Sequence, residues 1–395
     1  MSEVLIAGVG MVPFRKPGQS DPYDVMGAAA ACNALADAGI DYADVRQAYA
    51  SYVYADSCAG QAAIYRVGIT GIPIFNVNNN CGSGSSAFYL AAQAVGCGAV
   101  DCALAVGFEQ MQPGALGLAF PEKTNPLDRH IRAVGGLMGI AEEELSLPPA
   151  VMLFGCQTER LLNQTGMAES TLAQIPIKAR RHAAANEYAI FRTPLTVEQI
   201  LDGPPLYRGV RRLFACPPSC GAAAVVVCNE AFARRHGIRT DIRLIGQGAC
   251  SDRAEFFHSD AQDVISRGVT RTAAQQAYAN AGVGPEDIDV IELHDCFASN
   301  EIVAYADLGL CDEHDLEKFV IDGDNTYGGK FVVNPSGGLL AKGHPLGATG
   351  LAQLTELVWQ LRGQAGLRQV DGARTALQHN GGLGSAGHVN ILQRG

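Results

Sequence analysis

The chain has 395 residues, of which 48% are hydrophobic and only 17% are charged, so much of it must form a folded interior. Its formal net charge is -11, and no run of lysine and arginine is long enough to form a nucleic-acid footprint. No apolar run reaches membrane-spanning length. We therefore expect neither a nucleic-acid partner nor a transmembrane segment.

The chain contains 12 cysteines, which are scattered rather than paired at the spacings of a disulfide framework. The N-terminal sequence MSEVLIAGVG lacks the charged region and cleavage site of a signal peptide. These features predict reduced thiols and a cytoplasmic protein. Cys216 and Cys220 form the nearest approach to a metal-binding pair, but no second pair lies nearby, so we expect no metal site.

The first hundred residues predict alternating strands and helices around alanine-rich and β-branched runs. An alanine-rich helix over Met26–Ala38 ends at Gly39, a residue typical of a helix C-cap. The extended segments on either side of it are expected at Val4–Val9, Val45–Tyr54, Phe75–Val77 and Ala99–Val106.

Cys81 lies in the most informative stretch, FNVNNNCGSGSSAFYLAAQAV, which runs from Phe75 to Val95. The pattern predicts a strand, a tight polar turn and the start of a long helix, with the cysteine at the bend. Unpaired N–H groups at a helix start favour an anion, so a thiolate there is expected to be stabilised and reactive. The alternative is a buried structural cysteine.

Residues 111–212 interrupt the alternation with prolines, arginines and a helical stretch over Ile175–Tyr188. This segment is interpreted as an inserted lobe that covers a site and shapes its pocket. Residues 1–110 and 213–235, which include a buried strand at Ala222–Val227, then form one half of the fold, and residues 236–395 form the other half.

The second half repeats the order of the first. A helix over Ala273–Ala281 ends at Gly282 and precedes a strand at Ile288–Leu293. A glycine-rich turn at Pro335–Gly338 then precedes a helix over Leu351–Leu361, and Thr375–Leu392 supplies closing strands around a glycine loop. Two such halves predict a layered α/β duplication.

Three further segments place reactive side chains at predicted turns, where an α/β scaffold presents functional groups. His294 and Cys296 follow a strand, His344 lies between glycine and proline, and QHNGGLGSAG spans Gln378–Gly387. A nucleophilic thiol needs a base, and chemistry next to a carbonyl needs a second acid or base and an oxyanion site. Cys81, Cys296, His294 and His344 together supply these roles. Taken singly, His344 is also compatible with a turn residue and Cys296 with core packing.

The segment Gly382–Gly387 matches GxGxxG, but no acidic residue follows about twenty positions later, so a dinucleotide site is not expected. Its glycines are better suited to let backbone N–H groups face a substrate oxygen.

Several of these blocks resemble thiolases, specifically the sterol-carrier-protein-x type. The similarity runs from about Val4 to the end of the chain. The matching blocks are NVNNNC around Cys81, IELHDCF (Ile291–Phe297), DNTYGGK (Asp324–Lys330), NPSGGLLAKGHPLGATG (Asn334–Gly350) and ALQHN (Ala376–Asn380). The resemblance implies an α/β class protein with the duplicated, five-layered α-β-α-β-α thiolase fold, a homodimer, and coenzyme A as co-substrate with no bound cofactor.

The resemblance also implies roles for individual residues. Cys81 would be acylated, His344 would activate it, and Cys296 would be the acid and base at the α-carbon. His294 and His344 would bind the thioester oxyanion, and the N–H of Cys81 would form a second oxyanion site with the loop near Gly381. Ordinary thiolases carry a Cys-x-Gly loop where this chain has Gln378 to Asn380, so that duty falls on Cys296. Substrate-binding residues are not assigned; Arg129, His130 and Arg132 are compatible with a phosphate contact or with a solvated basic face.

The expected activity is thiolytic cleavage of a 3-oxoacyl-CoA, or its reverse Claisen condensation. One alternative is retro-aldol cleavage of a 3-hydroxyacyl-CoA together with a small partner carrying an oligonucleotide-binding-type barrel. Others are acetyl transfer between aromatic ketones without coenzyme A, and non-enzymatic binding of acyl-CoA or lipid.

Overall fold

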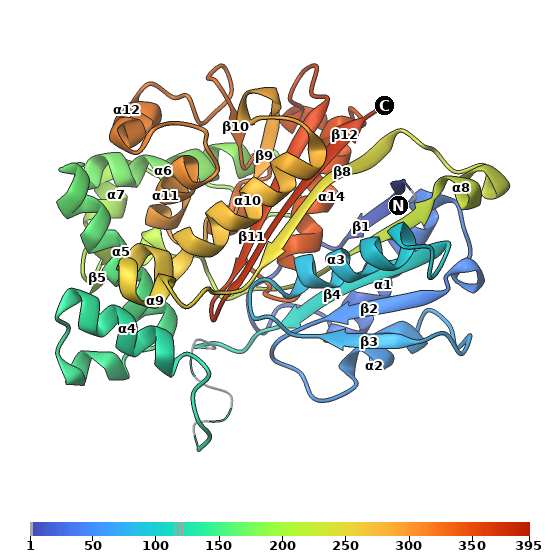
Figure 1. The fold of residues 1–395 in the computed structure, drawn as a ribbon, viewed down its shortest axis with the longest axis horizontal. Coiled ribbons are helices and arrows are strands. Elements are labelled where there is room, and N and C mark those ends of the chain that lie inside the picture. Colours follow the sequence, from blue (N-terminus) through green and yellow to red (C-terminus); the bar gives the residue numbers. More distant parts are fainter. Residues whose placement is uncertain (1–2, 115–116, 118–119, 121) are drawn as a thin grey trace.

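The computed structural model describes residues 3–114, 117, 120 and 122–395 (Figure 1). The strands are β1 (Val4–Met11), β2 (Gln47–Ser51), β3 (Ile74–Val77), β4 (Cys102–Gln110), β5 (Pro205–Tyr207), β6 (Val210–Arg211), β7 (Cys220–Asn229), β8 (Ile242–Cys250), β9 (Val290–Glu292), β10 (Val332–Val333), β11 (Thr375–Gly382) and β12 (Ala386–Arg394). The α-helices are α1 (Tyr23–Ala38), α2 (Ala59–Tyr65), α3 (Ser83–Gly96), α4 (Asp128–Met138), α5 (Pro149–Thr165), α6 (Glu169–Ala183), α7 (Val197–Leu201), α8 (Glu230–His236), α9 (Phe256–Ser259), α10 (Gly268–Ala281), α11 (Ala298–Asp307), α12 (Leu316–Ile321), α13 (Gly338–Ala341) and α14 (Thr349–Leu361).

The main sheet consists of two halves with the same topology. One half has the order β3-β2-β4-β7-β1 and the other has the order β10-β9-β11-β12-β8. In each half, the first three strands pair in parallel, and each of the last two strands pairs antiparallel with the strand before it. The halves join where β1 pairs with β8 through Val4↔Leu244 and Leu5↔Arg243. The predicted duplication is therefore present in the strand order.

Helices cover both half-sheets and also separate them. Apolar residues of α3 and α14 share one core with strand residues of both halves, so these two helices form the central layer. Helix α1 covers the outer face of the first half, and α10 covers that of the second half (Figure 1). The prediction of a five-layered α-β-α-β-α fold is confirmed.

Glycines on the two joining strands bring the outer helices close to the sheet in the same way. A Cβ on Gly8 of β1 would lie 2.3 Å from the carbonyl oxygen of Ala34 in α1. A Cβ on Gly246 of β8 would lie 2.3 Å from the carbonyl oxygen of Ala277 in α10. Only glycine permits such an approach, because any side chain would overlap the helix backbone. The duplication therefore extends to the packing between helix and strand.

Some elements differ from their predicted bounds or were not predicted. The helix expected over Ile175–Tyr188 is α6, which begins earlier, at Glu169, and ends at Ala183. Strand β8 and helix α5 were not predicted. Helices α4 to α7 gather on one side of the molecule, next to α11 (Figure 1). They belong to the predicted insert, whose boundaries at residues 111 and 212 stay a prediction. Among the residues that the structure describes, no helix is both long and apolar enough to cross a membrane.

Candidate active site

Cys81 lies in the turn between β3 and α3, as the sequence predicts. Asn80 adopts a left-handed conformation with a φ of 52°, and its side-chain amide donates to the carbonyl oxygen of Leu383 at 3.1 Å. This bond ties the turn of the first half to the β11–β12 loop of the second. The position of Cys81 therefore depends on both halves of the fold.

The starts of α3 and α14 lie against each other. A Cβ on Gly84 would lie 2.9 Å from the carbonyl oxygen of Gly347, and one on Gly350 would lie 2.5 Å from the backbone nitrogen of Ser85. These two glycines allow backbone-to-backbone packing at the point where each central helix begins. This packing brings the turn that carries Cys81 close to the loop that carries His344.

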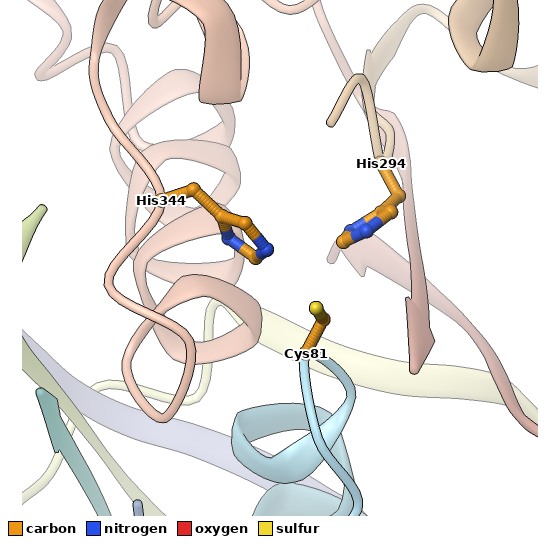
Figure 2. A group of neighbouring side chains, drawn as sticks. All are labelled: Cys81, His294 and His344. Atoms are coloured by element: carbon orange, nitrogen blue, oxygen red, sulfur yellow. The ribbon is translucent and has the colours of Figure 1, made fainter. Parts of the chain in front are cut away.

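Cys81, His294 and His344 converge on one point (Figure 2). One ligand-type atom from each residue lies within 4.8 Å of those from the other two. The imidazole rings of His294 and His344 meet edge to face, with centroids 5.1 Å apart. The structure thus brings together three of the four side chains that the sequence singled out.

Burial governs the ionisation of these groups. It raises the pKa of Cys81 to about 12, although the backbone N–H groups of Leu383 and of Cys81 itself lower it. The expectation of a thiolate stabilised at rest by the helix start is therefore wrong: desolvation outweighs the local N–H groups, and the thiol is protonated at neutral pH. Burial also lowers the pKa of His344 to about 3, so its ring is neutral.

His344 is held at the site by hydrogen bonds to its backbone and its ring. The backbone N–H of His344 donates to the hydroxyl of Ser219 at 3.0 Å, which fixes the loop. Nε2 of His344 is buried and has no hydrogen-bond partner among the residues that the structure describes. An unpaired ring nitrogen beside a protonated thiol is the arrangement that general-base activation requires. Burial, with the neighbouring His344 and His379 adding to it, holds the pKa of His294 well below its usual range, so this ring is also neutral.

Cys296 is buried and lines the same cavity as Cys81. Its carbonyl oxygen accepts a hydrogen bond from the backbone N–H of Cys216 at 2.9 Å, and burial raises its pKa well above the usual range of a thiol. Cys216 also lines the cavity, whereas Cys220 belongs to β7. These two cysteines therefore face different surroundings.

The cavity has a volume of about 190 Å³ and is lined by polar site residues and by many apolar side chains. The polar residues that line it include Cys81, His294, Cys296, His344 and His379, together with the glycine Gly381. Its apolar walls come largely from α5 and from the segment before α10. Wall residues include Leu127, Val151, Phe154, Leu206, Ile265 and Val269. Phe154 stacks on Phe297 with a centroid distance of 4.6 Å, so α5 packs directly beside the loop that carries His294 and Cys296.

Glu109 is a buried residue of the site that the sequence analysis missed. Its carboxylate accepts hydrogen bonds from the backbone N–H groups of Val53, Tyr54 and Gly347, at 3.1, 2.9 and 3.0 Å. Burial raises its pKa to about 7 despite these three donors. Glu109 thereby joins the loop after His344 to the first half of the fold. The sequence does contain a signal for this residue. Glu109 is the single charged residue in the apolar run CALAVGFEQ, and a charged residue in such a run indicates a buried group that needs partners.

Arg129, His130 and Arg132, for which the sequence left a phosphate contact and a solvated basic face open, do not line the cavity. Nε2 of His130 lies 2.7 Å from a carboxylate oxygen of Asp252, and the guanidinium of Arg129 lies 4.4 Å from the ring centroid of Phe257. Arg132 is exposed. The GxGxxG segment forms the turn between the antiparallel strands β11 and β12, which is not the strand-to-helix context of a dinucleotide site.

The neutral thiol–imidazole pair gives a pH prediction. Alkylation of Cys81 by iodoacetamide is expected to be independent of pH between ~6 and ~9, because the proton moves within the pair and not to solvent. In a His344→Ala variant the thiol must lose its proton to solvent, so the rate should rise about tenfold per pH unit below a pKa of about 12. Peptide mapping by mass spectrometry follows Cys81 alone. A midpoint near the ordinary cysteine value in the parent protein would contradict the pair.

The chain matches family models along most of its length. The model of the thiolase N-terminal domain matches residues 4–200, and the model described as thiolase C-terminal domain-like matches residues 251–394. Sterol carrier protein 2 of Oryctolagus cuniculus is 43% identical over 400 residues, a match that covers 100% of this chain and 72% of that protein. Benzoylsuccinyl-CoA thiolase subunit BbsB of Thauera aromatica is 34% identical, over 97% of this chain and 95% of that protein.

Solved structures share the fold. The chain superposes on an Ltp2-ChsH2(DUF35) aldolase with a TM-score of 0.83 and 22% identity, over 99% of this chain and 98% of that chain. It superposes on human mitochondrial 3-ketoacyl-CoA thiolase in complex with CoA with a TM-score of 0.73 and 18% identity, over 100% and 98% of the two chains. At these identities the likeness shows the architecture alone.

Proposed function

The chain belongs to the thiolase family and is an acyltransferase enzyme, and from this premise we propose that it cleaves 3-oxoacyl-CoA thioesters through an acyl-Cys81 intermediate, with coenzyme A as co-substrate. The reverse Claisen condensation uses the same groups. The observation that carries the proposal is the convergence of Cys81, His294 and His344, within 4.8 Å of one another. Cys296 lies in the same cavity.

The first half of the reaction forms the acyl-enzyme. Nε2 of His344 takes the proton of the Cys81 thiol, and the sulfur attacks the 3-keto carbon of the substrate. The bond between C2 and C3 then breaks, and Cys296 gives its proton to the C2 carbanion, which leaves as acetyl-CoA. The electron pair of the broken bond forms the new C–H bond. The acyl group, which contains C3, remains bonded to the Cys81 sulfur.

The second half returns the enzyme to its starting state. The thiol of coenzyme A loses its proton to the Cys296 thiolate and attacks the acyl carbonyl carbon, and the Cys81 sulfur leaves as a thiol after taking the proton back from His344. Negative charge develops on the substrate oxygen in each step. His294 and His344 are proposed to stabilise it at one oxyanion site, and the backbone N–H of Cys81 with the loop at Gly381 at the other.

Retro-aldol cleavage of a 3-hydroxyacyl-CoA is the second candidate, because the chain shares its fold with the Ltp2-ChsH2(DUF35) aldolase. In that reaction a small barrel-domain partner protein would bind this chain. Retro-aldol cleavage needs no covalent intermediate, however, whereas Cys81 and Cys296 both face the cavity. This arrangement supports acyl transfer over the aldolase reaction and over plain lipid binding, whereas acetyl transfer without coenzyme A would use the same cysteine nucleophile.

The apolar walls support an acyl chain as the part of the substrate that enters the cavity, as expected of an enzyme of lipid metabolism. We further propose a homodimer. Strand β3 lies at the edge of the sheet, and Ile69 and Phe75 are 77% and 47% exposed near it. An edge strand with exposed apolar side chains invites pairing with a second copy.

Intact-mass spectrometry after brief incubation with acetoacetyl-CoA tests this proposal. We expect an acetyl adduct on the parent protein and none on a Cys81→Ala variant. The same sample under native conditions should have twice the mass of one chain. Unmodified protein with intact substrate would contradict the thiolase mechanism. Cleavage of a 3-hydroxyacyl-CoA that requires an added small partner protein and leaves no adduct on Cys81 would favour the retro-aldolase.

A further inference from the structure

We propose that Thr349 and Asn380 are positioning residues that hold the two site histidines in opposite tautomers: a bare Nε2 on His344 and a protonated Nε2 on His294. One histidine is thereby set as a base before substrate arrives, and the other as a hydrogen-bond donor. The inference rests on the proposed function for the meaning of these roles, but the tautomers themselves follow from the hydrogen bonds of two neutral rings.

The tautomer of His344 follows from one backbone carbonyl. The hydroxyl of Thr349 donates its proton to the carbonyl oxygen of Pro345 at 3.0 Å, and a carbonyl can only accept. The oxygen of Thr349 lies 2.7 Å from Nδ1 of His344 and has no further proton to give, so it accepts from Nδ1–H. The ring is neutral, so its other nitrogen, Nε2, carries a lone pair.

The tautomer of His294 follows from a longer chain of polar side chains, which also starts at a backbone carbonyl. The amide nitrogen of Gln353 donates to the carbonyl oxygen of His379 at 3.2 Å. The side-chain oxygen of Gln353 must therefore be the end that accepts from the amide nitrogen of Gln378, at 2.8 Å. This orients Gln378, whose amide nitrogen also donates to the hydroxyl of Ser85 at 2.8 Å.

The chain ends at the histidine ring. Because the oxygen of Ser85 already accepts from Gln378, its own proton goes to the side-chain oxygen of Asn380, at 2.9 Å. The amide nitrogen of Asn380 then faces Nδ1 of His294 at 3.0 Å and can only donate to it. Nδ1 of the neutral ring is therefore the acceptor, and the ring proton lies on Nε2.

The two assignments divide the work of the site. The bare Nε2 of His344 can take the Cys81 proton at once, and the Nε2–H of His294 can donate to an oxyanion without any rearrangement. The assignment also bears on metal binding. Cys81, His294 and His344 have donor types that zinc accepts, but a ring nitrogen that carries a proton offers no lone pair to a metal. Asn380 thus favours acid–base chemistry at this cluster.

Nuclear magnetic resonance on protein labelled with ¹⁵N-histidine tests the inference, because long-range ¹H–¹⁵N spectra distinguish the two neutral tautomers. His294→Gln and His344→Gln variants assign the two signals. We expect His294 with its proton on Nε2 and His344 with its proton on Nδ1, both neutral at pH ~7. The same tautomer on both rings, or the reverse pair, would overturn the inference.

Variants of the two positioning residues test the causes. Thr349→Val removes the acceptor for Nδ1–H, so the His344 proton should shift to Nε2, and kcat should fall at least about tenfold with little change in KM. Thr349→Ser keeps the hydroxyl, so the His344 proton should stay on Nδ1 and kcat should stay close to that of the parent. Thr355→Val is the matched control, since Thr355 on the same helix donates to the carbonyl of Leu351 at 2.8 Å but forms no hydrogen bond with any histidine that the structure describes.

Asn380→Asp offers only acceptor oxygens, so a proton should appear on Nδ1 of His294. Unchanged tautomers in Thr349→Val and Asn380→Asp would contradict the assigned roles.

The spectra and the mass measurement separate two kinds of failure. An acyl adduct on Cys81 with other tautomers would reject this inference and leave the thiolase mechanism standing. The expected tautomers with no adduct would reject the mechanism and leave the positioning roles intact.

Discussion

Alanine in place of His344 is expected to lower kcat/KM for 3-oxoacyl-CoA thiolysis about 10²- to 10⁴-fold, the usual contribution of a general base. The pKa of Cys81, about 12, leaves almost no thiolate at neutral pH. Nε2 of His344 is buried and has no hydrogen-bond partner among the described residues, and a ring nitrogen of His344 lies within 4.8 Å of the Cys81 sulfur. Removing it leaves the reaction dependent on the small fraction of thiol that ionises to solvent.

Loss of 3-oxoacyl-CoA absorbance measures this effect, and His388→Gln is its control. His388 is also buried, its pKa is lowered to about 4 by burial, and its Nε2 bonds the Ser86 hydroxyl at 2.9 Å. It does not line the cavity. The control should keep a rate within a few-fold of the parent. If His344→Ala also stays within tenfold of the parent, His344 is not the base.

Loss of the Lys178 side-chain charge is expected to have the largest effect on stability. Lys178 of α6 forms an ion pair with Glu301 of α11, and the two side chains are 4% and 0% exposed. The ammonium also donates to the carbonyl oxygen of Val333 at 3.3 Å. A Lys178→Met variant leaves the Glu301 charge buried without its partner, so the free energy of unfolding should fall by about 3–5 kcal/mol.

Urea unfolding measures this loss, with Lys318→Met as the control. Lys318 pairs with Asp322 on the surface and is 70% exposed, so its removal should leave the free energy of unfolding close to that of the parent. The double variant Lys178→Met with Glu301→Leu should recover most of the loss, because it removes both charges together. A Lys178→Met protein as stable as the Lys318→Met protein would show that Glu301 does not need this partner.

The same ion pair influences the ionisation of a residue next to the site. Asp295 lies between His294 and Cys296, and its carboxylate accepts from the backbone N–H groups of Leu339 and Leu340 at 2.8 and 3.3 Å. Burial, with the Glu301 charge adding to it, raises the pKa of Asp295 to about 8, while Lys178 lowers it. The charges of the pair therefore act on a residue of the loop that carries two proposed reactive residues.

Local patterns predicted the elements that local physics determines. Helix α1 ends at Gly39, and helix α10 ends at Gly282, because each glycine adopts the left-handed conformation, with φ of 69° and 68°. The turn at Cys81 and the loop at His344 were also predicted, because glycine, asparagine and proline mark turns through their own backbone preferences.

The missed features depend on contacts between distant residues. Strand β8 contains glycines and polar residues that weaken a strand signal, and its pairing with β12 and its contact with α10 make it extended. The ionisation of Cys81 failed as a prediction for the same reason: the turn sets the nearby N–H groups, but distant segments set the burial. The bond from Ser85 to Asn380 spans 295 positions of sequence, which no local pattern encodes.

The two central helices begin side by side, and each beginning comes from a different copy of the repeated unit. The first copy contributes sulfur at its helix start, and the second contributes imidazole. The two copies therefore share an architecture but differ in the reactive side chain at the helix start. Neither copy alone holds both Cys81 and His344. A fragment from either copy alone is therefore expected to form no acyl-enzyme, since the proposed nucleophile and its proposed base are neighbours only where the two copies meet.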